Sequence, residues 1–278
     1  MNISSAPLTA GPDVQFASGP AGRIAYRDID GEGIPIVFVH GINMSSGVWS
    51  KVVPLLEGRR RIIMDLRGHG NSHSNSPFEI DDYLADLKHV IEATKISRFQ
   101  LVGVSLGGMI ACLYAQEHPE NVQSVVAFGS APVGKHPNLN GAMRRLRAIG
   151  VASYFEASLE KLTLPPGVDR EVRDLVVSYA IDGREDATMV EAVTRAGFTT
   201  DLSHRLVPSG CPVLIVNGEL DRTCTPELGR ALAISTGGEA LEIPNGGHIL
   251  PLETPAECAR LIAGMTRDAD SARRGETS

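Results

Sequence analysis

The chain has 278 residues, of which 42% are hydrophobic, and this length suits one large domain with an insertion or two small domains. Its formal net charge is −7, and its Lys and Arg residues form no long run or aromatic-interleaved basic patch, which argues against a nucleic-acid partner. No apolar run reaches the roughly 18 residues that cross a bilayer, and residues 1–14 lack the apolar core of a signal peptide. We therefore expect no membrane partner and a cytoplasmic location.

Four cysteines, Cys112, Cys211, Cys224 and Cys258, are scattered along the chain and form no C-x-x-C pair. Cys112 falls in a predicted helix that should be packed. This pattern favours free thiols over disulfides or metal ligands, so the sequence indicates no metal site.

The N-terminal part of the chain predicts strands. Residues 14–17 and 22–27 alternate weakly between apolar and polar side chains and are joined by a Gly-Pro pair, which is typical of an antiparallel hairpin. Residues 34–39 are continuously apolar, as in a strand covered on both faces, and this run ends abruptly at His40. Loops at the carboxyl ends of strands are where α/β sheets place ligands.

Helices and strands then alternate, which predicts a parallel sheet. Between residues 82 and 94, apolar side chains recur at helical spacing around charged ones and indicate an amphipathic helix laid on a sheet. The expected elements are a short helix at 49–56, a strand at 61–66, the helix at 82–94, a buried strand at 99–104, a helix at 106–118 and a buried strand at 122–128.

This alternation stops between residues 132 and 210, where apolar residues follow helical periods and predict an insertion of three or four helices. The sheet resumes afterwards, and the residues beyond Met265 are charged, small and aperiodic, which predicts a disordered tail. The later elements are a strand at 212–217, a helix that Thr225-Pro226 would cap, a strand at 240–243 and a last helix that opens with a capping box at 254–257.

The pattern Gly103-x-Ser105-x-Gly107 lies where the strand at 99–104 breaks into the next helix. A serine on so sharp a turn has a strained backbone, and side chains two positions before and after it would collide with the neighbouring strand and helix. Two glycines at these offsets arise by chance roughly 0.2 times in a chain of this composition, so the strand-turn-helix context carries the interpretation. That context predicts a nucleophile elbow.

A serine hydroxyl is a poor nucleophile near neutral pH and needs a base, together with a third group that fixes the tautomer of that base. Asp221 follows one buried strand, and His248 follows the final strand. Glu219, two residues before Asp221, is a rival for the acid. The order Ser, Asp, His is that of α/β-hydrolases.

The sequence resembles an α/β-hydrolase fold serine hydrolase over roughly residues 20 to 265. The matching pieces, each after a predicted strand, are His40-Gly41, Asp65-x-Arg67-Gly68-His69-Gly70-x-Ser72, Gly103-x-Ser105-x-Gly107-Gly108, Gly218-x-x-Asp221 and Gly247-His248. The resemblance implies a mostly parallel eight-stranded sheet with helices on both faces. It divides the chain into a discontinuous core, residues 1–131 and 211–278, and an inserted helical lid, residues 132–210.

The resemblance also implies the roles of the site residues. Ser105 is the nucleophile, His248 the base and Asp221 the acid that orients it. The backbone N–H groups of Ile42 and Leu106 form the oxyanion hole, and the site needs no cofactor and no metal.

Three further features bear on these roles. In this family the histidines of the glycine loops, His40 and His69, are usually structural, and Asp65 is expected to tie down the loop around Arg67. A serine at the elbow argues against haloalkane dehalogenases and epoxide hydrolases, which use an aspartate there. The inserted helices carry three arginines whose ordinary explanation is a solvated face, the alternative being one that reaches a substrate carboxylate. They are Arg144, Arg145 and Arg147.

The sequence therefore predicts a serine hydrolase that cleaves a small carboxylic ester or lactone through an acyl-enzyme. One alternative is a hydrolase of carbon–carbon bonds in a diketone-type substrate, which uses the same three residues. Another is a small-molecule receptor that keeps the fold and turns over negligibly.

Overall fold

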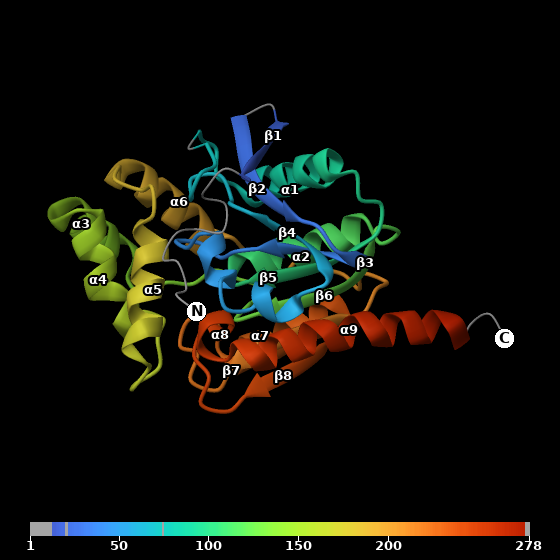
Figure 1. Cartoon of the computed structure of the whole chain (residues 1–278). Helices are drawn as coiled ribbons and strands as arrows, with labels where there is room; N and C mark the ends of the chain where they lie inside the picture. Colours follow the sequence, from blue (N-terminus) through green and yellow to red (C-terminus); the bar gives the residue numbers. More distant parts are fainter. Residues whose placement is uncertain (1–12, 20–21, 74, 276–278) are drawn as a thin grey trace.

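The computed structural model describes residues 13–19, 22–73 and 75–275. In these residues the protein is built on one eight-stranded sheet with the order β1-β2-β4-β3-β5-β6-β7-β8 (Figure 1). The strands are β1 (Gln15–Gly19), β2 (Gly22–Ile29), β3 (Glu32–Val39), β4 (Arg59–Met64), β5 (Phe99–Val104), β6 (Val122–Phe128), β7 (Val213–Gly218) and β8 (Glu239–Ile243). The six neighbouring strands β4, β3, β5, β6, β7 and β8 are parallel to one another. Strand β2 pairs antiparallel with β4 on one side and with β1 on the other, and the pairing with β1 confirms the predicted hairpin. Its connecting residues, 20 and 21, lie outside the described part.

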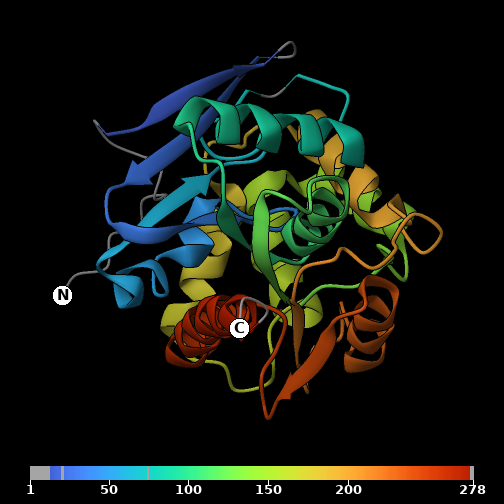
Figure 2. The same cartoon turned by 90° about the vertical axis from the view of Figure 1, so that its right-hand side faces the viewer.

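Helices cover both faces of the sheet, as Figure 2 shows. Every residue of β5 and of β6 is buried, which explains why both sequences are mostly apolar. One face packs against α1 (Ile80–Thr94), α2 (Leu106–Glu117) and α7 (Pro226–Thr236), and the other against α8 (Leu250–Glu253) and α9 (Pro255–Gly275). The carboxyl ends of the parallel strands therefore share one edge of the sheet, and the loops that follow them converge there.

Two local predictions were wrong. In place of one helix at 49–56, the chain forms two 3₁₀ turns, η1 (Ser46–Trp49) and η2 (Val53–Leu56). Pro54 explains the difference, because it has no N–H to donate and its ring would clash with the carbonyl four residues earlier. The expected disordered tail is helical as far as residue 275, since α9 continues beyond Met265 through a stretch that has no proline and no glycine before Gly275.

Between β6 and β7 the chain forms four helices, within the predicted three or four. They are α3 (Leu139–Ile149), α4 (Val151–Leu162), α5 (Arg170–Ile181) and α6 (Ala187–Thr199). These helices share a small core of their own, which includes Met143, Leu146, Phe155 and Val190, and they lie together at one side of the molecule (Figure 1). We call residues 132–210 the helical insertion.

Among the described residues, no helix is both long and apolar enough to cross a bilayer. The cytoplasmic location stays a prediction.

Candidate active site

Ser105 occupies the turn between β5 and α2 in a strained conformation, with φ 55° and ψ −121°. Its N–H donates to the Phe128 carbonyl at 2.9 Å, which ties the turn to the end of β6. A Cβ on Gly103 would lie 2.3 Å from the carbonyl carbon of Gly107, and a Cβ on Gly107 would lie 2.2 Å from the Val39 carbonyl oxygen. The two glycines of the motif are therefore needed for the helix to cross this closely over the strands.

His248 and Asp221 form a buried hydrogen-bonded pair. His248 Nδ1 donates to Asp221 Oδ2 at 2.8 Å, and each residue is 3% exposed. The other oxygen, Asp221 Oδ1, accepts the backbone N–H groups of Thr223 and Cys224, both at 2.8 Å. Because an ionised carboxylate only accepts, the pair places the imidazole proton on Nδ1 and leaves Nε2 with a free lone pair.

The surroundings of His248 favour its charged form. Burial lowers the pKa of this imidazole, but the charge of Asp221, the hydrogen bond to it and the charge of Glu253 together raise the pKa above its ordinary value. The raised pKa makes the His248 imidazole a stronger base than an ordinary histidine.

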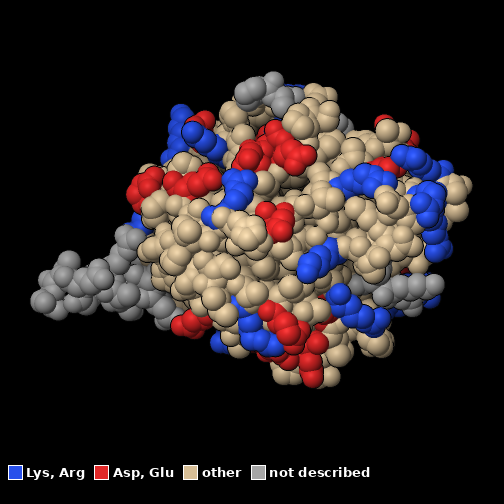
Figure 3. Space-filling view, turned by 180° about the vertical axis from the view of Figure 1, so that it is seen from behind, with Lys and Arg blue, Asp and Glu red and all other residues tan. Residues whose placement is uncertain are grey.

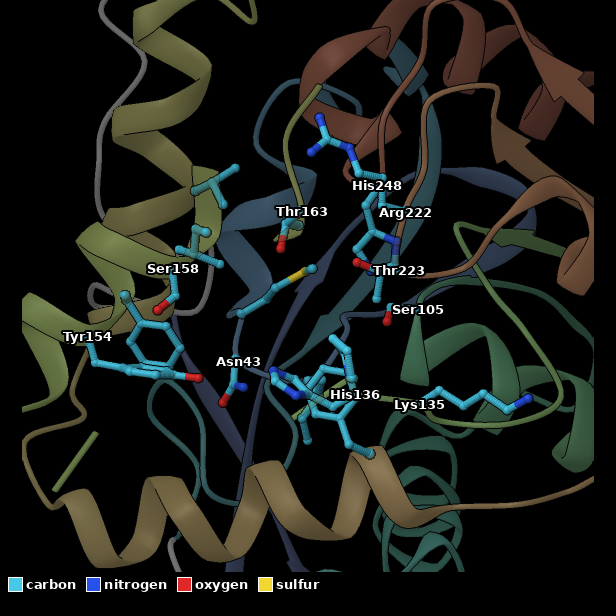
Figure 4. A pocket seen from close by; sticks show the side chains of 17 residues that line it. Asn43, Ser105, Lys135, His136, Tyr154, Ser158, Thr163, Arg222, Thr223 and His248 are labelled. Carbon is cyan, nitrogen blue, oxygen red and sulfur yellow. The ribbon is translucent and has the colours of Figure 1, made fainter. Parts of the chain in front are cut away.

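Ser105 and His248 line the same pocket, of about 240 Å³ (Figure 4). Its floor comes from loops at the carboxyl ends of the strands, and its other wall comes from the helical insertion through Tyr154, Phe155 and Phe198. The lining is mostly apolar, with Ser105 and His248 meeting at one end (Figure 4). A mostly apolar pocket with a few converging polar groups is typical of a site for a small molecule, and Ser105 and His248 are two of those groups here.

Two backbone N–H groups are available near the serine. Leu106 is the first residue of α2, so its N–H has no partner inside the helix, and Ile42 lines the pocket. In the described part of the chain, neither N–H donates to a protein acceptor outside regular helices and strands. Such groups can stabilise an oxyanion.

The rings of His40 and His69 are buried, bond to backbone groups and do not line the pocket. Each ring bonds a carbonyl oxygen through Nδ1 and accepts a backbone N–H at Nε2: His40 joins Gly41 to Leu66, and His69 joins Arg67 to Asn43. Burial lowers the pKa of both imidazoles, to well below the ordinary value for His69. Both rings are therefore neutral, and their hydrogen bonds fix the loop that contains Ile42.

Asp65 also anchors loops. Its carboxylate accepts the N–H of Ser46 at 2.8 Å and that of Asn71 at 3.0 Å. Arg67 pairs with the buried Asp86, so the loop that contains both His69 and Arg67 is tied down at two points.

Glu219 does not contact His248. It is exposed, and its carboxylate accepts the N–H of Asn245 at 2.9 Å. The structure therefore places Asp221, and not Glu219, against the imidazole.

The arginines at 144, 145 and 147 are exposed on α3 and do not line the pocket. Arg147 pairs with Glu191 instead. Figure 3 shows basic side chains gathered at the side where the helical insertion lies, with acidic and basic side chains mixed over the rest of that face. The solvated-face interpretation fits these positions.

Sequence reasoning missed the cations that do line the pocket, Lys135 and Arg222, both exposed. It also missed Glu253, which no local pattern distinguishes from an ordinary helix residue. In the described part, no group of three or more His, Cys, Asp or Glu residues could hold a metal ion.

A family model described as alpha/beta hydrolase fold matches residues 34–255. The chain belongs to this family. The membership confirms the predicted fold, and it supports the predicted class, an enzyme of the carboxylic ester hydrolase type.

Relatives of known name fall in several reaction classes. The chain is 29% identical over 243 residues to 2-succinyl-6-hydroxy-2,4-cyclohexadiene-1-carboxylate synthase of Enterobacter sp. (strain 638), covering 84% of this chain and 91% of the relative. It is 28% identical over 205 residues to pimeloyl-[acyl-carrier protein] methyl ester esterase of Aeromonas hydrophila, covering 69% and 78%. The enol-lactonase from Burkholderia xenovorans LB400 superposes with a TM-score of 0.81 at 23% identity, covering 90% and 99%, a similarity of fold.

Proposed function

We propose that the protein hydrolyses a small carboxylic ester or lactone through an acyl-enzyme on Ser105. His248 is the base, Asp221 orients it, and the N–H groups of Ile42 and Leu106 form the oxyanion hole. The observation that carries the proposal is the buried Asp221–His248 hydrogen bond at 2.8 Å beside a serine on a strained elbow in the same pocket. The chain is similar to an esterase and to an enol-lactonase, and both names belong to the proposed reaction class.

In the proposed mechanism, His248 Nε2 accepts the hydroxyl proton of Ser105 while the serine oxygen attacks the carbonyl carbon. The negative oxygen of the tetrahedral intermediate accepts the N–H groups of Ile42 and Leu106. The imidazolium then returns its proton to the leaving alkoxide, which departs from an ester and stays attached in a lactone. Water repeats the sequence to release the acid and restore the serine.

The helical insertion acts as a lid in this proposal. Tyr154, Phe155 and Phe198 line the pocket opposite Ser105, so the insertion supplies much of the surface that contacts the substrate. A pocket of about 240 Å³ with an apolar wall suits a small acyl group over a long chain. Lys135 and Arg222 stand at its exposed rim.

The experiment compares wild type with Ser105→Ala on short-chain p-nitrophenyl esters, on small lactones and on a β-diketone. We expect a burst of one p-nitrophenol per protein followed by steady turnover, both lost in the variant. Binding of these compounds without turnover above the Ser105→Ala level would favour the receptor alternative. Faster cleavage of the diketone than of any ester would favour the carbon–carbon hydrolase.

A further inference from the structure

The loop between β8 and α8, residues 244–249, carries His248 and is fixed by a side chain outside the three proposed catalytic residues. We call it the histidine loop. Glu253, the last residue of α8, accepts the N–H of Gly247 on Oε2 at 2.6 Å and the N–H of Ile249 on Oε1 at 2.8 Å. These N–H groups belong to the residues on either side of His248. One carboxylate therefore holds both ends of the peptide segment that presents the imidazole.

The same segment is closed from the other side by the helical insertion. The N–H of His248 donates to the Thr163 carbonyl at 3.3 Å, so three consecutive N–H groups have fixed partners. A Cβ on Gly247 would lie 2.4 Å from Pro165 Cδ and 2.9 Å from Glu253 Oε2. Glycine at this position is what lets the carboxylate approach the loop.

Glu253 is also close enough to act on His248 through its charge. Burial, together with the charge of Asp221, raises the pKa of Glu253 above its ordinary value, although its two N–H partners and the charge of His248 act in the opposite direction. Each carboxylate oxygen accepts one N–H bond, which favours the ionised form. In return, its charge raises the pKa of His248. A negative charge on this side favours the imidazolium that forms during reaction.

The other charged groups around His248 come from different elements. Asp221 and Arg222 lie on the loop after β7, and Lys135 and His136 lie across the pocket on the segment before α3. Among the described groups, Asp221 and Glu253 are the ones that raise the pKa of His248. Removing the charge of Glu253 therefore leaves Asp221 as the single carboxylate acting on the imidazole.

We propose that Glu253 is a positioning residue for His248: it holds the backbone N–H groups of the two residues on either side of this histidine and stabilises the imidazolium by its charge. The proposal rests on the proposed function for its kinetic consequences. It concerns a residue that does not touch the substrate, since Glu253 does not line the pocket.

The test is Glu253→Gln, with Glu219→Gln as a matched control. Glutamine keeps one acceptor oxygen, so it loses one of the two N–H bonds and the whole charge. Glu219 also anchors the histidine loop, through the N–H of Asn245, but it does not shift the pKa of His248. The control therefore removes a charge and weakens a loop contact without acting on the imidazole.

We expect Glu253→Gln to lower kcat/KM roughly tenfold, because a small misplacement of a catalytic group is costly. We also expect the acidic limb of its pH profile to move to lower pH, while Glu219→Gln keeps both values near those of wild type. A tenfold loss with an unmoved limb would show a merely structural role and overturn the proposal. So would an equal shift in Glu219→Gln.

Two additions keep the test decisive. If Glu253→Gln does not fold, Glu253→Asp keeps the charge but is one methylene shorter, and activity equal to wild type would overturn the positioning role. Titration of the His248 ring by NMR, in wild type and in Glu253→Gln, needs no substrate. A lower pKa in the variant supports the proposal even if the wild type hydrolyses no ester, whereas an unchanged one overturns it.

Discussion

Asp221→Asn is the substitution that tests the proposed acid most directly. Asp221 Oδ1 accepts two backbone N–H groups at 2.8 Å each, from Thr223 and Cys224. The amide oxygen of asparagine must take this place, because an NH₂ group there would face two donors. The NH₂ group then replaces Oδ2 and points a hydrogen at His248 Nδ1. The imidazole is forced to carry its proton on Nε2, where it cannot accept the proton of Ser105.

The expected loss follows from this tautomer. The equivalent change in a serine protease lowers kcat by roughly 10⁴, which is about 5.4 kcal/mol of transition-state stabilisation at about 1.36 kcal/mol per tenfold. We expect a loss of that order in kcat with a smaller change in KM, since Asp221 does not touch the substrate pocket. The assay is steady-state hydrolysis of a short-chain p-nitrophenyl ester, with the fold checked by circular dichroism.

Glu219→Gln is the control, because this carboxylate is exposed and bonds only the N–H of Asn245 in the described structure. It should stay within roughly threefold of wild type, as surface substitutions generally do. The reasoning is refuted if folded Asp221→Asn stays within about tenfold of wild type, or if Glu219→Gln is the crippled enzyme.

Three further outcomes are expected. An organophosphonate should add covalently to the wild type and not to Ser105→Ala in intact-protein mass spectrometry, and labelling that survives in the variant would remove the serine from its role. With a non-ionising ester, kcat/KM should fall as the pH drops through the pKa of His248, because the protonated ring cannot accept a proton. This pKa lies above the ordinary 6.5. A flat profile from pH 5 to 8 would contradict the base assignment. Gly103→Ala should lower the free energy of unfolding by about 2 kcal/mol or more because its Cβ meets Gly107 backbone at 2.3 Å, while Gly264→Ala, with open space around it in α9, should raise it by about 0.5 kcal/mol. Thermal unfolding of the two variants checks this, and similar effects of both would count against the elbow geometry.

Much of the core could be predicted from local sequence. The runs at 99–104 and 122–128 match β5 and β6 residue for residue, because a strand buried on both faces must be apolar at successive positions. The elbow was visible for a similar reason, since glycines at fixed offsets are a local requirement of a turn packed this closely. The alternation of strands and helices also placed Ser105, Asp221 and His248 after predicted strands.

Features that depend on a partner far along the chain could not be derived from local residues. Asp221 and Glu219 are two residues apart and chemically alike, so only the resemblance to the family favoured Asp221; the turn after β7 places Asp221 against His248 and Glu219 against Asn245. Glu253 looked like an ordinary helix residue until its hydrogen bonds to the histidine loop were known.

The sequence by itself determined which segments are buried strands and which of them end in reactive side chains, because burial and turn strain act over a few neighbouring residues. The tertiary structure alone decided the strand order, in which β3 lies between β4 and β5, and the side chains that line the pocket. In the structure the arginines of α3 are exposed to solvent, and Lys135 and Arg222 lie at the exposed rim of the pocket. These outcomes depend on how the helical insertion packs against the rest of the protein. A local pattern of residues does not specify which distant surface the segment will contact.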